Sequence, residues 1–233
     1  MEQENMLLRK HLFQTGWFCS ILVGLLYVSV AVTHFFLPLE QLRGGQAISE
    51  AFFVSLAGHS LMFSVHYGLV VILALLSIPV VLAIHERIRP AHPGLVLWMT
   101  VVGILGSALA MVDFASVGIK APRIAHGFLE ASPLEKSVIV VNGLPHVDPC
   151  FLAWGLLGIW ALVCNVLACK NRSYPRFLGA VGILGGGAYL LACLGSVVQM
   201  QRLVDVAVGL GGLILAPVWY VGFGIVMRTW SRL

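Results

Sequence analysis

The chain has 233 residues, of which 59% are hydrophobic and only 10% are charged. Soluble domains carry roughly 25% charged residues, so this composition excludes an ordinary soluble protein and predicts an integral membrane protein. The formal net charge of +4 comes from basic residues scattered through short polar segments, and we therefore expect no nucleic-acid partner. At about 20 residues per spanning helix, the length accommodates six helices and no sizeable soluble domain. Residues 1–233 are predicted to form a single transmembrane domain.

The predicted fold class is all-α, a polytopic transmembrane bundle of six helices. The apolar runs place the spans at about 16–37, 58–84, 94–119, 148–169, 177–198 and 206–227. Residues 39–57 are too polar to cross and predict a short interfacial helix before the second span. Residues 120–146 contain three prolines that break helices, Pro122 among them, and they predict a polar connection with room for a short interfacial helix.

Lysine and arginine are unevenly distributed between the two sides of this arrangement, with nine on one side and five on the other. The side richer in basic residues is predicted to be cytoplasmic, which places both the N- and the C-terminus in the cytoplasm. The two long connections, 39–57 and 120–146, are then external.

Two histidines stand at the entrance of the second span, in the sequence GHSLMFSVHYG at 58–68. In a continuous helix, His59 and His66 would share one face about 10 Å apart along the axis, with Met62 between them. That spacing predicts two side chains lining one pocket. It is too wide for the pair to bind a single metal ion, because each ligand nitrogen lies about 2 Å from its metal.

Polar side chains of other spans fall at a similar depth. Counted at 1.5 Å per residue from the predicted cytoplasmic ends, they lie about 25–34 Å away, near the outer boundary of a hydrocarbon core of about 30 Å. These observations predict an outward-facing cavity with a set of candidate ligand-binding residues: His34, His59, Met62, His66, Asp113, His146 and Gln199. The alternative is that each is an ordinary interfacial side chain or helix cap.

Asp113 is the least ordinary member of this set. It follows an apolar run, and a carboxyl group at that depth needs either a partner or a proton. A carboxylate that accepts a hydrogen bond from an imidazole orients that imidazole for proton transfer or metal ligation. His66, Asp113 and His34 are therefore the candidate catalytic residues, although the sequence leaves open whether the protein is an enzyme.

The compact signatures of serine hydrolases, zinc proteases, phosphate loops and c-type haem attachment are missing from the sequence, which disfavours these classes of protein. Three hypotheses about function are left open. The first is a cavity that binds a lipophilic small molecule, such as a quinone, an isoprenoid or a lipid, with acid–base chemistry on its polar head. The second is a redox subunit that binds haem b or copper. Its metal ligands are not assigned, and the candidate ligands are His34, His59, His66 and His146. The third is a structural subunit of a larger membrane complex.

The last 90 or so residues carry a more specific pattern. It consists of Asp148-Pro149, Gly155-Leu-Leu-Gly158, Tyr174-Pro-Arg-Phe-Leu-Gly179, Gly185-Gly-Gly-Ala-Tyr-Leu190 and Pro217-Val-Trp219. This C-terminal half resembles a bacterial family of six-span membrane proteins classed as a domain of unknown function, DUF4386. The resemblance implies six helices and a multi-pass protein of the bacterial inner (plasma) membrane, and it supplies no catalytic residues.

Overall fold

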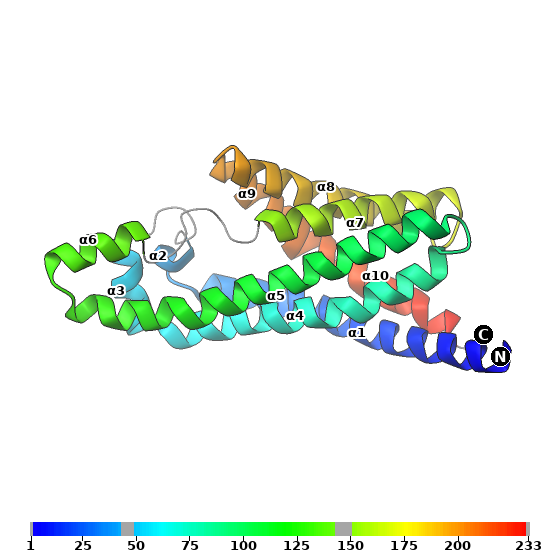
Figure 1. Ribbon diagram of the computed structural model, residues 1–233, viewed down its shortest axis with the longest axis horizontal. Helices are drawn as coiled ribbons and strands as arrows, with labels where there is room; N and C mark the ends of the chain where they lie inside the picture. Colours follow the sequence, from blue (N-terminus) through cyan, green and yellow to red (C-terminus); the bar gives the residue numbers. More distant parts are fainter. Residues whose placement is uncertain (1, 43–48, 143–150, 232–233) are drawn as a thin grey trace.

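The structure is a computed structural model that describes residues 2–42, 49–142 and 151–231. Over these ranges it is helical and contains no strands, and six of its helical stretches are long and apolar enough to cross a membrane (Figure 1). The prediction of an all-α six-span membrane protein is confirmed. The helices are α1 (Glu2–Phe36), α2 (Leu39–Leu42), α3 (Glu50–Gly58), α4 (Ser60–Ile88), α5 (Pro93–Glu130), α6 (Pro133–Asn142), α7 (Phe151–Lys170), α8 (Arg176–Val197), α9 (Gln201–Val208), the π-helix η1 (Gly209–Leu215) and α10 (Ala216–Trp230).

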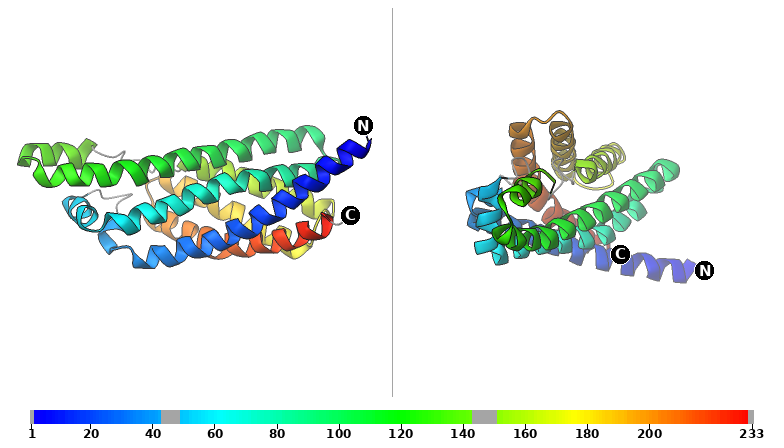
Figure 2. Two further views of the ribbon diagram at one scale, coloured as in Figure 1. Left: turned by 90° about the horizontal axis from the view of Figure 1, so that it is seen from below. Right: turned by 60° about the vertical axis from the view of Figure 1, so that its left-hand side comes forward.

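Neighbouring helices run side by side along the length of the bundle. Helix α1 packs on α10 and α4, α4 on α5, α5 on α7, and α7 on α8 (Figures 1 and 2). Both termini lie at one end, which is called the inner end below; the opposite end is the outer end. Helices α3 and α6 and the last part of α5 extend beyond the outer ends of α7 and α8 (Figures 1 and 2).

The inner half of the bundle is packed around one amide side chain. Asn165 of α7 is only 1% exposed and accepts hydrogen bonds from the Tyr174 hydroxyl, at 2.7 Å, and from Trp219 Nε1, at 3.0 Å. Its own amide nitrogen donates to the Ala161 carbonyl at 2.7 Å. A Cβ atom at Gly182 of α8 would overlap the Asn165 side chain, so the glycine makes room for this group. The polar atoms of Asn165 are thereby paired within a tightly packed region.

The helix of the third span, α5, ends later than the sequence predicted. It continues past residue 119 and through Pro122 to Glu130, although an internal proline removes one backbone hydrogen bond. The reason is tertiary packing, since Ala121, Ala125 and Phe128 share a face and are fully buried against α3. The rings of Phe53 and Phe128 stack with centroids 5.0 Å apart. Burial of this face compensates for the missing bond.

The prediction that His59 and His66 share one continuous helix face is wrong. Helix α3 ends at Gly58 and α4 begins at Ser60, while His59 lies between them with φ −139° and ψ 48°. The His59 N–H donates to the Ser55 carbonyl at 3.0 Å and so completes the end of α3. The expected short helices are present in both of the long connections that were predicted to be external: α2 and α3 in the first, α6 in the second.

The last span begins earlier than predicted, at Gln201 instead of residue 206, and it changes helix type part of the way along. Pro217 has no N–H to donate, and the helix before it widens so that the Ala216 N–H bonds the Gly211 carbonyl five residues back. A Cβ atom at Gly211 would come within 3.0 Å of the Ala188 Cβ on α8. The earlier start brings Gln201 and Asp205 of α9 into the spanning segment.

Candidate functional site

A cavity of about 480 Å³ lies in the central and outer part of the bundle, between α1, α4 and α5 on one side and α7 to α10 on the other. Along α4 its wall runs from Phe63 to Ser77, which corresponds to about 21 Å of helix. Gln41 of α2 and Phe52 of α3 line it at the outer end. The volume falls in the range of roughly 300–1,000 Å³ that is typical of small-molecule pockets.

Most of the wall is apolar, and it is rich in aromatic rings and glycines. The aromatic residues that line it are Tyr27, Phe52, Phe63, Tyr67, Phe114, Trp154, Trp160, Tyr189, Trp219 and Tyr220. Glycines of α8 and η1 leave space on the opposite side: Gly182, Gly185, Gly186, Gly209, Gly211 and Gly212. Such a wall suits the apolar body of a ligand, because burial of apolar surface is the main favourable contribution to its binding.

Polar side chains from α1, α4 and α9 gather toward the outer end of the cavity. We call Thr33, His34, His66, Gln201 and Asp205 the outer polar cluster. Thr33 Oγ1 lies 2.8 Å from His66 Nδ1, and the rings of His34 and His66 have centroids 5.9 Å apart. Gln201 Nε2 donates to Asp205 Oδ1 at 2.6 Å, and the Asp205 carboxylate lies close enough to His34 to interact with it electrostatically. The cluster thus combines imidazoles with a carboxylate and an amide.

Hydroxyl groups line the middle of the cavity and mostly bond to one another. The Tyr27 and Tyr189 hydroxyls are 2.7 Å apart, and the Tyr220 hydroxyl donates to Ser77 Oγ at 3.4 Å. The rings of Tyr27 and Tyr220 stack with centroids 5.7 Å apart. These contacts join α1, α4, α8 and α10 and hold the middle of the cavity in shape.

Two buried polar atoms of the lining residues have no hydrogen-bond partner among the described residues, the Trp160 Nε1 donor and the Gln41 Oε1 acceptor. Trp160 is 3% exposed, and its indole covers Gly103, where a Cβ atom would lie 2.8 Å from the ring. An unpaired buried donor or acceptor costs about 1–3 kcal/mol. The protein tolerates this cost in side chains that line the cavity.

The structure brings together only part of the predicted pocket. His34 and His66 both line the cavity, whereas His59, Met62, Asp113 and Gln199 do not belong to its wall. Among the described residues Asp113 has no hydrogen bond or ion pair, and Gln199 lies in the turn between α8 and α9 with φ 57°. His146 lies outside the described residues. Ligand-binding or catalytic roles for these residues stay predictions.

Sequence reasoning missed several polar residues of the wall, among them Gln41, Gln201 and Asp205. The last two were missed because the sixth span was expected to begin one residue after Asp205. A usable signal was present, since Gln201 and Asp205 are four residues apart and fall on one face of an amphipathic helix that leads directly into the apolar run. Gln41 had no comparable signal, because its burial depends on the packing of α2 against α3.

In residues 2–42, 49–142 and 151–231 no group of three or more His, Cys, Asp or Glu side chains is placed to hold a metal ion. The predicted metal-ligand candidates include His146, which is not among those residues. Haem b and copper therefore stay predictions from the sequence, as does a quinone.

No curated protein matches the chain, and no solved structure matches it. The sequence profile of a family described as a domain of unknown function, DUF4386, matches residues 22–225. The match is longer than the C-terminal half in which the resemblance was noted, and it includes the outer polar cluster. Since it covers most of the chain, the protein belongs to the DUF4386 family.

Proposed function

We propose that the protein binds a lipophilic small molecule, such as a quinone, an isoprenoid or a lipid, in the cavity between its helices. The observation that carries this proposal is the combination of an apolar, aromatic-lined cavity of about 480 Å³ with polar groups gathered toward its outer end. A ligand with one polar head and a long apolar body matches both parts. The head lies at the outer polar cluster, and the body extends inward toward Ser77 and Trp160.

The outer polar cluster also supports acid–base chemistry on the head of the ligand. Among the described residues, Asp205 is the carboxylate that lies close enough to His34 to interact with it electrostatically. His66 lines the same cavity and has a different partner, the Thr33 hydroxyl. Two imidazoles in different surroundings are suited to giving and accepting a proton. We place the protein in the bacterial inner membrane, with the outer polar cluster toward the outer leaflet.

The direct test is to identify what the purified protein carries. We expect mass spectrometry of an organic extract to find one lipophilic molecule in about equimolar amount with the protein, and metal analysis and an optical spectrum to find no bound metal or haem. A Soret band or stoichiometric copper would instead support the redox hypothesis. An empty protein that needs a partner for stability would support the structural-subunit hypothesis.

A matched pair of substitutions on α8 tests whether the cavity is the binding site. Gly185 lines the cavity, and a Cβ atom there would meet only Leu215, at an ordinary 3.8 Å, whereas Gly187 does not line it and has nothing within 4 Å. Gly185→Leu should fill the cavity and reduce the amount of co-purified ligand at least about tenfold. Gly187→Leu should leave it unchanged. Equal ligand content in the two variants would contradict the proposed site.

A further inference from the structure

The hydrogen bonds of Thr33 bear on which nitrogen of His66 carries a proton. The Thr33 hydroxyl donates its single hydrogen to the Val30 carbonyl, one turn back on α1, at 3.0 Å. Its oxygen also lies 2.8 Å from His66 Nδ1, where the tautomer of the ring decides which atom donates; with the hydroxyl hydrogen on the Val30 carbonyl, the oxygen accepts. In that arrangement the Nδ1 atom of His66 is the donor. In a neutral imidazole the other nitrogen, Nε2, then carries a lone pair and can only accept.

The surroundings of His66 favour the neutral ring. It lies in the spanning part of α4, where a charged side chain is costly, and its partner Thr33 carries no charge. The titratable side chains nearest to it in the outer polar cluster are His34, whose positive charge would repel a second one, and Asp205, which interacts with His34. No hydrogen bond occupies His66 Nε2 among the described residues, and His66 lines the cavity.

We infer that the cavity selects lipophiles that carry a hydroxyl group, whose O–H donates to Nε2 of His66. This inference rests on the proposed function and narrows its ligand class. A ketone, ester or ether oxygen has only lone pairs to offer and would face the lone pair of Nε2. An alcohol or a phenol, such as a prenol, a sterol or a quinol, supplies the missing hydrogen.

The chain repeats the same arrangement away from the cavity. Thr100 of α5 donates to the Val96 carbonyl at 2.7 Å, and its oxygen lies 2.7 Å from His85 Nδ1. This second pair lies at the inner end, and neither residue lines the cavity. The His85–Thr100 pair is therefore a built-in control, with the same hydrogen bonds and no access to the ligand.

Binding of two matched probes tests the inference. Farnesol and its methyl ether share one apolar body and differ in the O–H donor. In lipid nanodiscs we expect the wild-type protein to bind farnesol about tenfold more tightly than the ether. Thr33→Val removes the acceptor that fixes the ring, so that Nε2 can also carry hydrogen, and the preference should fall to about threefold or less. Thr100→Val should keep the wild-type preference.

The outcomes separate this inference from the proposed function. Equal binding of both probes, or an unchanged preference in Thr33→Val, overturns the inference while leaving a lipophile-binding cavity in place. Binding of neither probe overturns the inference, and it overturns the proposed function as well if the organic extract is also empty. Nitrogen-15 NMR of labelled histidine gives a readout that needs no ligand. We expect the Nδ1–H tautomer at His66 and its loss in Thr33→Val, and an Nε2–H signal in the wild type would overturn the inference.

Discussion

Two neighbouring tryptophans lie where the packed inner core meets the cavity, and they differ in how their N–H groups are paired. The rings of Trp160 and Trp219 meet edge to face with centroids 6.1 Å apart. Both residues line the cavity, but the N–H of Trp219 is bonded to the buried Asn165, whereas the N–H of Trp160 has no partner among the described residues. Polar groups with every bond made specify a unique packing, while unpaired ones beside a space are candidates for ligand contacts. Buried polar groups in this membrane protein therefore fall into two kinds: paired groups that fix the packing, and unpaired groups that are candidates for ligand contacts.

The largest expected effect breaks the inner core. Asn165→Val leaves the Tyr174 hydroxyl and the Trp219 N–H unpaired in a buried region, and we expect it to lower the free energy of unfolding by about 3 kcal/mol or more. Unfolding in mixed micelles with increasing denaturing detergent measures this. Asn171→Ala is the control, because Asn171 bonds Leu167 at an exposed turn and should cost about 0.5 kcal/mol. Similar losses in the two variants would contradict a special role for Asn165.

The next effect concerns the outer polar cluster and should appear in binding. Asp205→Asn keeps the size of the side chain and its contact with Gln201 but removes the charge that acts on His34. We expect about tenfold weaker binding of farnesol with little change in unfolding. Asp113→Asn is the matched control, a carboxyl group in a spanning helix that does not line the cavity. A larger loss at Asp113 would return the site to the arrangement predicted from sequence.

A smaller effect is expected at the tyrosine pair in the middle of the cavity. Tyr27→Phe removes one of two hydroxyls that lie 2.7 Å apart and should cost about 1 kcal/mol of unfolding free energy. Tyr189→Phe should cost about the same, and the double substitution little more than either one, because both remove a single hydrogen bond. Unfolding of all three variants gives the coupling between the two residues. Additive losses would show that the two hydroxyls act independently.

The smallest effect lies at the exposed start of α6. The Ser132 N–H donates to the Glu135 carboxylate at 2.7 Å, and the Glu135 N–H donates to Ser132 Oγ at 3.4 Å, which is a capping box. The hydrogen bonds from Ser132 lower the pKa of Glu135 below its ordinary value. The stabilisation is therefore present above the ordinary pKa of Glu and is lost as the pH falls through the lowered one.

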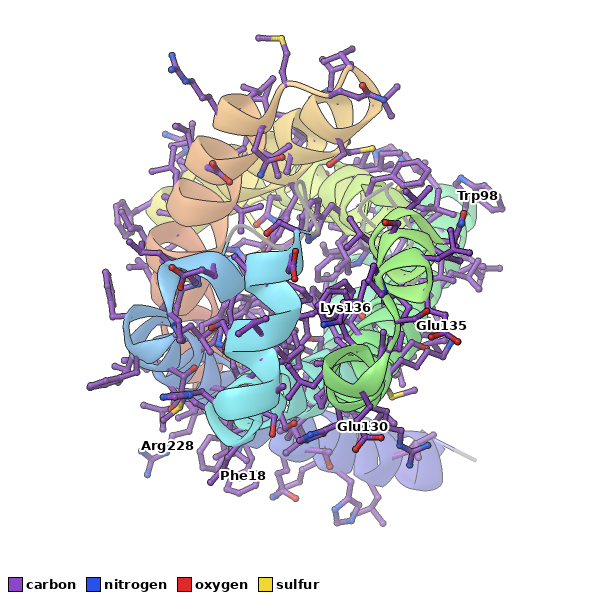
Figure 3. All side chains as sticks on the ribbon, turned by 90° about the vertical axis from the view of Figure 1, so that its left-hand side faces the viewer. Phe18, Trp98, Glu130, Glu135, Lys136 and Arg228 are labelled. Atoms are coloured by element: carbon purple, nitrogen blue, oxygen red, sulfur yellow. The ribbon has the colours of Figure 1, made fainter. Side chains whose placement is uncertain are left out.

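Hydrogen exchange of the α6 amides, corrected for intrinsic rates, should detect this loss as faster exchange at low pH. Glu135→Gln should remove the pH dependence. Glu130→Gln is the control, because Glu130 is a nearby exposed carboxyl outside the capping box (Figure 3). Unchanged exchange across the pH range in the wild type would mean that the capping box contributes nothing to the stability of α6.

Composition and hydropathy were sufficient for the class of protein and the number of spans. In lipid every backbone polar group must be paired within the segment, so an apolar run of sufficient length has to be a helix whatever surrounds it. The short helices of the two long connections were also predictable, since the polar residues there exclude a crossing. The local break at His59 and the continuation of α5 through Pro122 were not, because both depend on the packing of Phe53 and its neighbours between α3 and α5.

For the candidate site, the sequence determined the depth of each side chain in the membrane, and the tertiary structure decided whether that side chain faces the cavity. Counting residues along a helix gives the height of a side chain in the membrane, and this placed His34 and His66 near each other. The same count cannot give the rotation of each helix about its axis, which is set by which small residues let neighbouring helices approach. Helix α9 is positioned by the close approach of Gly211 to α8 and by the widened turn before Pro217, and Asp205 of α9 therefore lines the cavity. The packing of α5 leaves Asp113 outside the cavity wall.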